Sequence, residues 1–244
     1  MKGRMDVSRL WLLYRMGGLP PALASMFGMQ DAQQMAFIRS MAKSQRKESL
    51  LHKPLQELET VVFDLETTGF NPASGDEILS FGAVAMRGAE ILHGQTFYRL
   101  VKPKRGIPPQ IVLLTGISNE MAAEGKDLID SLHDFMAFVG TRPLVAHASA
   151  HDKSFLNSAL RRTSKIGLNH RVLDTMHIAR ALEPGRDSYS LDELLAAHKI
   201  EISIRHHALE DARMTAGLWQ HYLGTIIARN LVTLGDLYTF LSKR

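Results

Sequence analysis

The fold is set by a short apolar stretch that reads Thr60-Val61-Val62-Phe63-Asp64-Leu65. β-Branched and aromatic residues of this kind favour an extended strand. Two further runs with strand character follow at residues 77–86 and 95–101, and turn signals separate the three runs at residues 69–75 and 87–88. Because the connections are short, the three runs predict an antiparallel meander.

Downstream of the meander the pattern alternates between helix and strand. Two short apolar strands are expected at residues 143–146 and 172–174. Helical periodicity is expected at residues 107–114, 126–139, 153–162, 176–182, 191–198 and 209–222, and in a tail helix after Thr233. A meander followed by this alternation predicts an α/β domain in which helices flank a mixed sheet.

The N-terminal quarter has a different character. Residues 1–59 contain nine Lys or Arg against five Asp or Glu, whereas the rest of the chain contains twenty of each. Short amphipathic helices are expected at residues 5–16 and 30–43, on either side of a Gly/Pro-rich break, and Pro54–Glu59 is interpreted as a linker. The region, taken as a helical N-terminal extension over residues 1–55, is either a cap packed on the main domain or a contact surface for nucleic acid or a partner protein. The sequence leaves both alternatives open.

Composition excludes several classes of protein. Cysteine is absent, so disulfides, iron–sulfur clusters, cysteine-ligated zinc and thiol catalysis are all impossible. The apolar run between Arg9 and Arg15 is too short for a signal peptide, and glycines and prolines interrupt the uncharged stretch Met16 to Gln30. We therefore expect a cytoplasmic protein without a membrane span.

A pair of carboxylates lies at the end of the first strand. Asp64 and Glu66 are two residues apart, so their side chains point to the same face of a strand. Burial and mutual repulsion would raise both pKa values, and a bound cation would relieve both costs. The alternative is a strand that simply runs into the polar turn at Thr67-Thr68-Gly69.

Two more acidic residues stand near predicted helix starts. Asp152 opens a helix after a small-residue loop, and Asp211 does so five residues after His206. Helix capping would explain either position. His147 and His151 are spaced four apart, but the segment between them lacks the Glu of a metalloprotease motif and no third ligand is evident, so zinc is disfavoured there.

Taken together, these residues favour a site for hard cations. Asp64, Glu66, Asp152 and Asp211 bring about four negative charges, which two divalent cations such as Mg²⁺ or Mn²⁺ would balance. An imidazole, which titrates near neutrality, supplies a base beside such a site.

The three segments 63–69, 145–156 and 206–212 resemble, in order and spacing, the three exonuclease motifs of the DEDD superfamily. The His five residues before the last Asp resembles the DEDDh branch, which includes the proofreading epsilon subunit of bacterial replicative polymerase, ribonuclease T and oligoribonuclease. The resemblance covers roughly residues 59–223 and implies a ribonuclease H-like fold. The implied domains are an exonuclease domain at residues 56–225 and a C-terminal helix at residues 226–244 packed on it.

The resemblance also implies an activity and its cofactors. The family reaction is a metal-dependent 3′–5′ exonuclease reaction that releases 5′-nucleotides from single-stranded ends, with two divalent cations, Mg²⁺ or Mn²⁺. DNA is slightly favoured as substrate. An RNA-trimming enzyme, and a catalytically silent nucleic-acid or partner-binding module, are the alternatives. A protein partner such as a polymerase could bind through the N-terminal extension.

Roles are implied residue by residue. The catalytic set comprises Asp64, Glu66, Asp152, His206 and Asp211, and the four carboxylates among them are the expected metal ligands. The expected substrate-binding residues are Thr67, Thr68, Leu114, Thr115 and His147.

Two features depart from the family pattern or are ambiguous within it. The family loop before Asp152 usually reads Ala-His-Asn-Ala-x-Phe-Asp, whereas here Ala148 replaces the Asn and His151 replaces the Phe, so hydrogen bonding in the loop must differ. His207 occupies the position four before Asp211, where the tyrosine branch of the superfamily places its catalytic side chain. The histidine branch uses the five-before position, so His206 is predicted to be the base.

Overall fold

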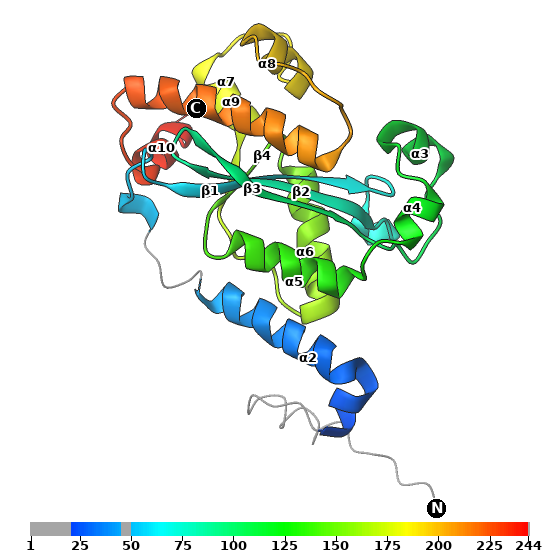
Figure 1. Cartoon of the computed structure of the whole chain (residues 1–244). Helices are drawn as coiled ribbons and strands as arrows, with labels where there is room; N and C mark the ends of the chain where they lie inside the picture. Colours follow the sequence, from blue (N-terminus) through cyan, green and yellow to red (C-terminus); the bar gives the residue numbers. More distant parts are fainter. Residues whose placement is uncertain (1–20, 45–49, 244) are drawn as a thin grey trace, which may run out of the picture.

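The computed structural model describes residues 21–44 and 50–243. Its centre is a five-stranded sheet with the strand order β3-β2-β1-β4-β5 (Figure 1). The strands are β1 (Glu59–Thr67), β2 (Ile78–Arg87), β3 (Glu90–Leu100), β4 (Leu144–Ala146) and β5 (Val172–Asp174). The pairs β1–β2 and β2–β3 are antiparallel, whereas β1–β4 and β4–β5 are parallel. The predicted mixed sheet is therefore confirmed.

Helices cover both faces of this sheet (Figure 1). The helices after the meander are α3 (Pro109–Thr115), α4 (Asn119–Ala123), α5 (Leu128–Val139), α6 (Ala150–Ser164), α7 (Thr175–Leu182), α8 (Leu191–Ala197), α9 (Ala208–Ala228) and α10 (Leu234–Leu241). One apolar core joins the sheet to α7–α10, and a second joins it to α5 and α6. The short helix α4 and the first five residues of β3 were not expected from the sequence, because both are largely exposed and carry little apolar periodicity.

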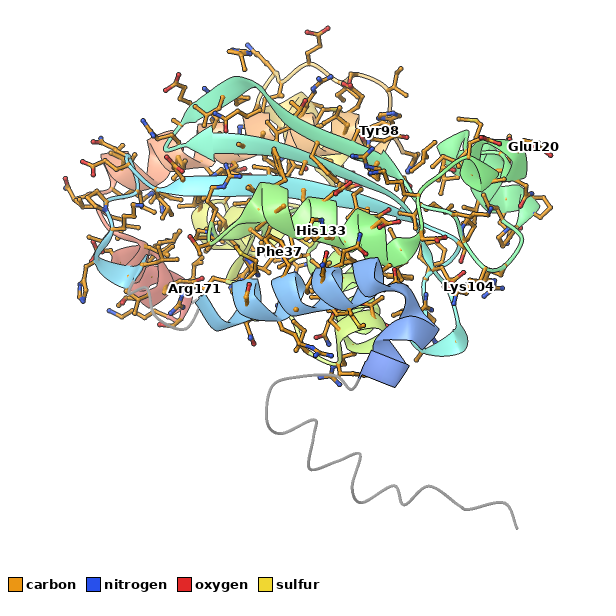
Figure 2. The ribbon with its side chains drawn as sticks, turned by 60° about the horizontal axis from the view of Figure 1, so that its bottom comes forward. Phe37, Tyr98, Lys104, Glu120, His133 and Arg171 are labelled. Carbon is orange, nitrogen blue, oxygen red and sulfur yellow. The ribbon has the colours of Figure 1, made fainter. Side chains whose placement is uncertain are left out.

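The described part of the N-terminal extension contains a long helix, which starts earlier than the sequence predicted. Helix α2 runs over Pro21–Ser44 instead of residues 30–43, since a proline is tolerated in a first helical turn. The helix expected at residues 5–16 lies outside the described residues. Residue Ile38 is fully buried, and the ring of Phe37 lies 4.7 Å from that of His133 on α5 (Figure 2). The second half of α2 therefore packs on the main domain, as the cap alternative requires.

The segment interpreted as a linker is instead part of the core. Leu55 and Leu58 are almost completely buried, and Pro54 forms a bridge with Thr233 just before α10. The two leucines of this segment are buried in the core. The proline and the polar residues around them made the segment resemble a linker in the sequence.

Among the described residues, no helix combines the length and apolar character needed to cross a membrane.

Helix α9 approaches the sheet very closely at one glycine. A Cβ atom on Gly82 of β2 would lie 2.1 Å from the backbone carbon of Ala208, the first residue of α9. Only a residue without a side chain allows this approach. The contact fixes the start of α9 against the middle of the sheet, where the acidic residues of β1 also lie.

Candidate active site

Three carboxylates meet where β1 ends and α9 begins. Asp64 and Glu66 project from the same face of β1, and Asp211 lies in the first turn of α9. Oxygen atoms of the three side chains all lie within 4.8 Å of one another. The structure thus brings together three of the four metal ligands that the sequence predicted, from segments almost 150 residues apart.

Asp152 stands beside this group without joining it. It is buried in the first turn of α6, and its Oδ1 accepts a hydrogen bond from the backbone N–H of Leu65, at 3.2 Å. One oxygen is therefore engaged in holding β1. Its charge still acts on the group, since Asp152 is the strongest charged influence that raises the pKa of Asp64.

Burial and mutual repulsion disfavour the ionised forms of these carboxyl groups. Burial, followed by the charges of Asp211 and Asp152, raises the pKa of Glu66 to about 8. Burial also raises the pKa of Asp152 to about 7, and the pKa of Asp64 lies well above its usual range. Grouped carboxylate oxygens that repel one another in this way are the donor set that a hard divalent cation fits.

A protein cation already contacts this group. The guanidinium of Arg205 pairs with Asp211 Oδ1, and its Nε donates to Asp192 on α8 at 2.5 Å. This charge counteracts the burial that raises the pKa of Asp211. Arg205 was not singled out in the sequence, because a single arginine one residue before the motif histidine carries no pattern of its own.

The raised pKa values predict how stability depends on pH without divalent cations. A carboxyl group whose folded pKa exceeds its unfolded value holds its proton more tightly in the folded protein, so stability falls as pH rises towards the folded pKa. Glu66 and Asp152 place this loss between about pH 4 and pH 8. We expect the melting temperature in chelator to drop by about 4–8 °C between pH 6.5 and pH 8.5, equivalent to ~2 kcal/mol.

The chosen pH range separates this effect from that of buried histidines. Burial lowers the pKa of His147, His151 and His170, and their opposite effect on stability acts mainly below pH 6.5. In the variant Glu66→Gln the drop should shrink. An unchanged melting temperature across this range in chelator would show that the carboxylates of the cleft do not repel one another in the folded protein.

The two adjacent histidines take different directions. His206 lines the acidic cleft, and its backbone N–H donates to Asp211 Oδ2 at 2.9 Å. The ring of His207 instead stacks on Tyr98 of β3, with ring centroids 4.6 Å apart. A positive φ of 59° at His206 produces this divergence, because it turns the chain sharply just before α9.

We therefore expect unequal losses when each histidine is replaced. His206→Ala should lower the hydrolysis rate at least about a hundredfold, since general-base help is typically worth ~10² to 10⁴. His207→Ala should cost less than about tenfold in rate, with most of its effect on stability through the lost stacking on Tyr98. Steady-state kinetics and a thermal melt of each variant test this pair. The reverse ranking of the two rates would assign the base to His207.

The loop before Asp152 is held by a carboxylate that is not a predicted ligand. Asp174, at the end of β5, accepts hydrogen bonds from the backbone N–H groups of Ala148 and Ser149, at 3.1 and 2.8 Å. Ala148 has a positive φ of 50°, a conformation that alanine rarely adopts and asparagine tolerates. The altered loop residue is thus a point of backbone strain.

Relieving that strain should stabilise the protein. Ala148→Gly and Ala148→Asn are each expected to raise the free energy of unfolding by about 1 kcal/mol, or about 2–4 °C in melting temperature. Ala150→Gly, at the exposed start of α6, is the matched control and should lower the melting temperature. A loss of stability in both Ala148 variants would show that the positive φ causes no strain.

The hydrogen-bonding groups of three expected substrate residues, Thr67, Thr68 and His147, are largely engaged within the protein. Thr68 is buried, its N–H donates to the carbonyl of Glu77, and its hydroxyl accepts from the N–H of Glu77. The hydroxyl of Thr67 donates to the carbonyl of Gly69 at 2.6 Å. His147 lines the cleft, but its ring nitrogens contact the hydroxyl of Thr175 and the carbonyl of Tyr189. Their contact with substrate remains a prediction.

Large apolar side chains are exposed on helix α3 and on the turn that follows the first motif. Leu114 of α3 is 44% exposed and its neighbour Leu113 is 89% exposed. The hydroxyl of Thr115 donates to the carbonyl of Ile111 and accepts from the N–H of Ile117. Phe70, just after the first motif, is 80% exposed, and its ring lies 6.1 Å from that of His151. Phe70 was missed in the sequence, although an aromatic residue in a Gly-rich polar turn is a usable signal for a binding surface.

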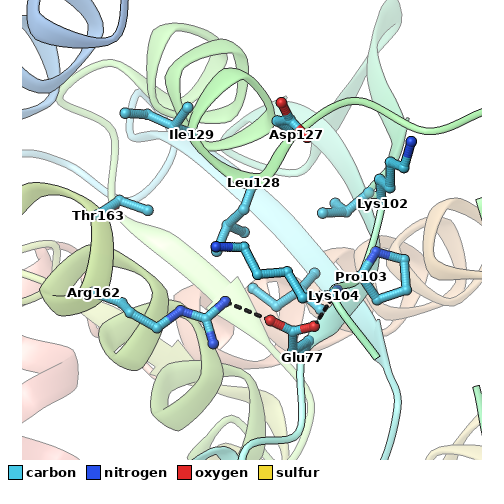
Figure 3. A pocket seen from close by; sticks show the side chains of 11 residues that line it. Glu77, Lys102, Pro103, Lys104, Asp127, Leu128, Ile129, Arg162 and Thr163 are labelled. Atoms are coloured by element: carbon cyan, nitrogen blue, oxygen red, sulfur yellow. Dashed lines mark hydrogen bonds and ion pairs between the residues drawn. The ribbon is translucent and has the colours of Figure 1, made fainter. Parts of the chain in front are cut away.

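The acidic cleft has a volume of about 320 Å³. A larger hollow of about 550 Å³ lies elsewhere, where Glu77 accepts hydrogen bonds from Arg162 and from the backbone N–H of Lys104 (Figure 3). These bonds tie the start of β2 to α6. Because the larger hollow contains none of the grouped carboxylates, size does not identify the reactive site here.

The family follows from comparison with known proteins. Residues 61–219 match the RNase_T exonuclease family. The chain belongs to this family. It carries an exonuclease domain of the DEDDh type, as predicted from its three motifs.

Two curated relatives show where such domains occur. The exonuclease is 34% identical to the PolC-type DNA polymerase III of Bacillus subtilis over 168 residues, and the aligned region covers 68% of this chain. It is 35% identical to a DNA polymerase III subunit epsilon-like protein of Rhodobacter capsulatus over 201 residues, and the aligned region covers 80% of this chain. The exonuclease spans only 12% and 28% of the lengths of these relatives.

Solved structures share the fold. The exonuclease resembles Exonuclease X in complex with 5′ overhanging duplex DNA, with a TM-score of 0.57 and 25% identity, over 68% of this chain and 92% of that one. It also resembles E. coli Exonuclease I in complex with a dT13 oligonucleotide, with a TM-score of 0.60 and 19% identity, over 71% of this chain and 42% of that one.

Proposed function

We propose that this protein is a divalent-metal-dependent 3′–5′ exonuclease that releases 5′-nucleotides from single-stranded ends. The observation that carries the proposal is the convergence of Asp64, Glu66 and Asp211, with His206 beside them, in one open cleft. The exonuclease family and the curated DNA polymerase III relatives support it.

The four carboxylates would divide their work in the reaction. Asp64, Glu66 and Asp211 would hold two divalent cations, and Asp152 would act on them directly or through water. When bound, the cations would lower the pKa of a water molecule and stabilise the departing 3′-oxygen. Arg205 would have to leave Asp211 as the cations bind, because both compete for the same carboxylate oxygen.

The proton from the attacking water would pass to His206. The side chain lies on the turn that leads directly into Asp211, so the base and the carboxylates are fixed by one short segment. A carboxylate oxygen of Glu66 would accept the hydrogen bond of the terminal 3′-hydroxyl. Each predicted catalytic residue thus has a role in the cleft, and Glu66 would serve both the cations and the 3′-hydroxyl.

Single strands would be held mainly by stacking. Leu113, Leu114 and Phe70 present apolar surface to solvent, and nucleobases stack on such side chains without strong sequence preference. The charge balance of residues 60–244 is neutral, so phosphate attraction contributes little away from the N-terminal extension.

DNA is the favoured substrate because both curated relatives are DNA polymerase III proteins. They also suggest a polymerase as partner. The extension over residues 1–55 would supply the contact, since it carries the excess positive charge and the second half of α2 already packs on the domain. RNA trimming is the alternative within the same chemistry.

The deciding experiment compares DNA and RNA oligonucleotides of one sequence, each labelled at the 5′ or the 3′ end, with Mn²⁺ supplied. We expect 5′-labelled DNA to shorten stepwise and 3′-labelled DNA to release labelled mononucleotide at once. Faster cleavage of RNA would assign the alternative substrate. Internal cleavage, or degradation from the 5′ end, would contradict the proposal.

A further inference from the structure

A second group of ligand-type side chains lies away from the acidic cleft. Glu183 ends α7, His198 ends α8 and His221 lies in the second half of α9. One ligand atom from each of the three lies within 4.8 Å of the other two. Asp211 and His221 are ten residues apart on α9, so the two groups are separated by about 15 Å along that helix.

The contacts within the group leave it open to an ion. Glu183 Oε1 lies 2.9 Å from His198 Nε2, and Glu183 Oε2 accepts from Arg186 at 2.7 Å. Arg186 thereby orients the carboxylate, as outer partners do for metal ligands. A cation bound between the two residues would lie against Glu183 Oε1 and His198 Nε2, in place of their direct contact.

The second imidazole completes the donor set. The rings of His198 and His221 stack with their centroids 4.0 Å apart, which places a second imidazole beside the Glu183–His198 pair. His221 is exposed, which leaves an entry path and room for water as a further ligand. A ring nitrogen of His221 already lies within 4.8 Å of the ligand atoms of Glu183 and His198.

We propose that Glu183, His198 and His221 form a binding site for a single zinc-type divalent cation. Two imidazole nitrogens and one carboxylate oxygen suit Zn²⁺ and its neighbours, whereas Mg²⁺ and Mn²⁺ prefer all-oxygen sites. The site joins α7, α8 and α9. Helix α8 connects this site to the acidic cleft, because His198 follows one end of the helix and Ser190 and Leu191, at its other end, line the cleft.

The test needs a chain in which the acidic cleft no longer competes for metal. The full-length protein with Asp64→Asn and Asp211→Asn, free of any histidine tag, is dialysed against Zn²⁺ in the presence of excess Mg²⁺. We expect one zinc per chain and a higher melting temperature with Zn²⁺ than without it. The inference is independent of nuclease activity, which this variant lacks by design.

Single replacements in that background locate the ion. His221→Ala changes an exposed side chain and should weaken zinc binding at least tenfold, and Glu183→Gln should weaken it as well. His93→Ala, at an exposed position of β3, is the matched control and should bind zinc unchanged. No bound zinc, or equal binding by His221→Ala and His93→Ala, would overturn the proposal and leave the group as a hydrogen-bonded helix contact.

Discussion

Replacing Asp64 or Asp211 by alanine is expected to lower the rate of 3′-end hydrolysis by several orders of magnitude. Each side chain belongs to the group of three carboxylates, so each replacement removes donor oxygens that the cations need. The measurement is the single-turnover rate on a 5′-labelled oligonucleotide with saturating Mn²⁺.

Unfolding would give the same loss, and the structure distinguishes the two causes. Burial and neighbouring charges raise the pKa of Asp64, so removal of this carboxyl group relieves repulsion and should not lower the melting temperature in chelator. Asp187→Ala, which changes a residue outside the cleft, is the matched control and should keep full activity. A loss of tenfold or less in both Asp64→Ala and Asp211→Ala would mean that the site has been misplaced.

Activity should vanish in chelator and return with Mg²⁺ or Mn²⁺, but not at a comparable rate with Ca²⁺. The reason is the donor set, which consists of carboxylate oxygens around one cleft in a chain without cysteine. Ca²⁺ is larger and accepts looser coordination, so it can bind without supporting the same reaction geometry. Titration of each ion into the chelated enzyme, with the rate as readout, tests this.

An outcome that contradicts the metal prediction is full activity in excess chelator. The pH experiment on stability provides an independent check, because bound cations should also abolish the fall in melting temperature between pH 6.5 and pH 8.5. The repulsion that causes this fall involves Glu66 and Asp152, whose raised pKa values follow from burial in the absence of cations.

The sheet and the acidic group could be predicted because their signals are local. The apolar strand β1 places Asp64 and Glu66 on one face, and the two helix-opening aspartates stand beside polar loops. Contacts that depend on tertiary packing left no such signal. The burial of Leu55 and Leu58 needs α10 and the sheet to be in place, and the pairing of Arg205 with Asp211 depends on the path of a loop.

The same limit applies to the substrate residues. Thr68 and His147 were chosen from motif position, but their hydrogen-bonding groups serve the β1–β2 turn and the loop before α8. The different directions of His206 and His207 depend on one backbone dihedral, which the sequence gives only as a family preference. Phe70 carries a usable sequence signal, as an aromatic residue in a Gly-rich polar turn, but only the structure shows that its side chain is exposed.

The backbone amide of Leu65 on β1 can serve as a probe of the active site, because its hydrogen-bond partner is a side chain of that site. On the β4 side, backbone pairing ends at Val62, and three residues later the carboxylate of Asp152 accepts the N–H of Leu65. The exchange of this amide hydrogen with deuterated solvent is therefore governed by a side chain of the active site. If cations draw Asp152 towards them, hydrogen exchange at the Leu65 amide should accelerate, while the neighbouring amides of β1 stay protected. The signal of this one amide would then report metal binding without any substrate.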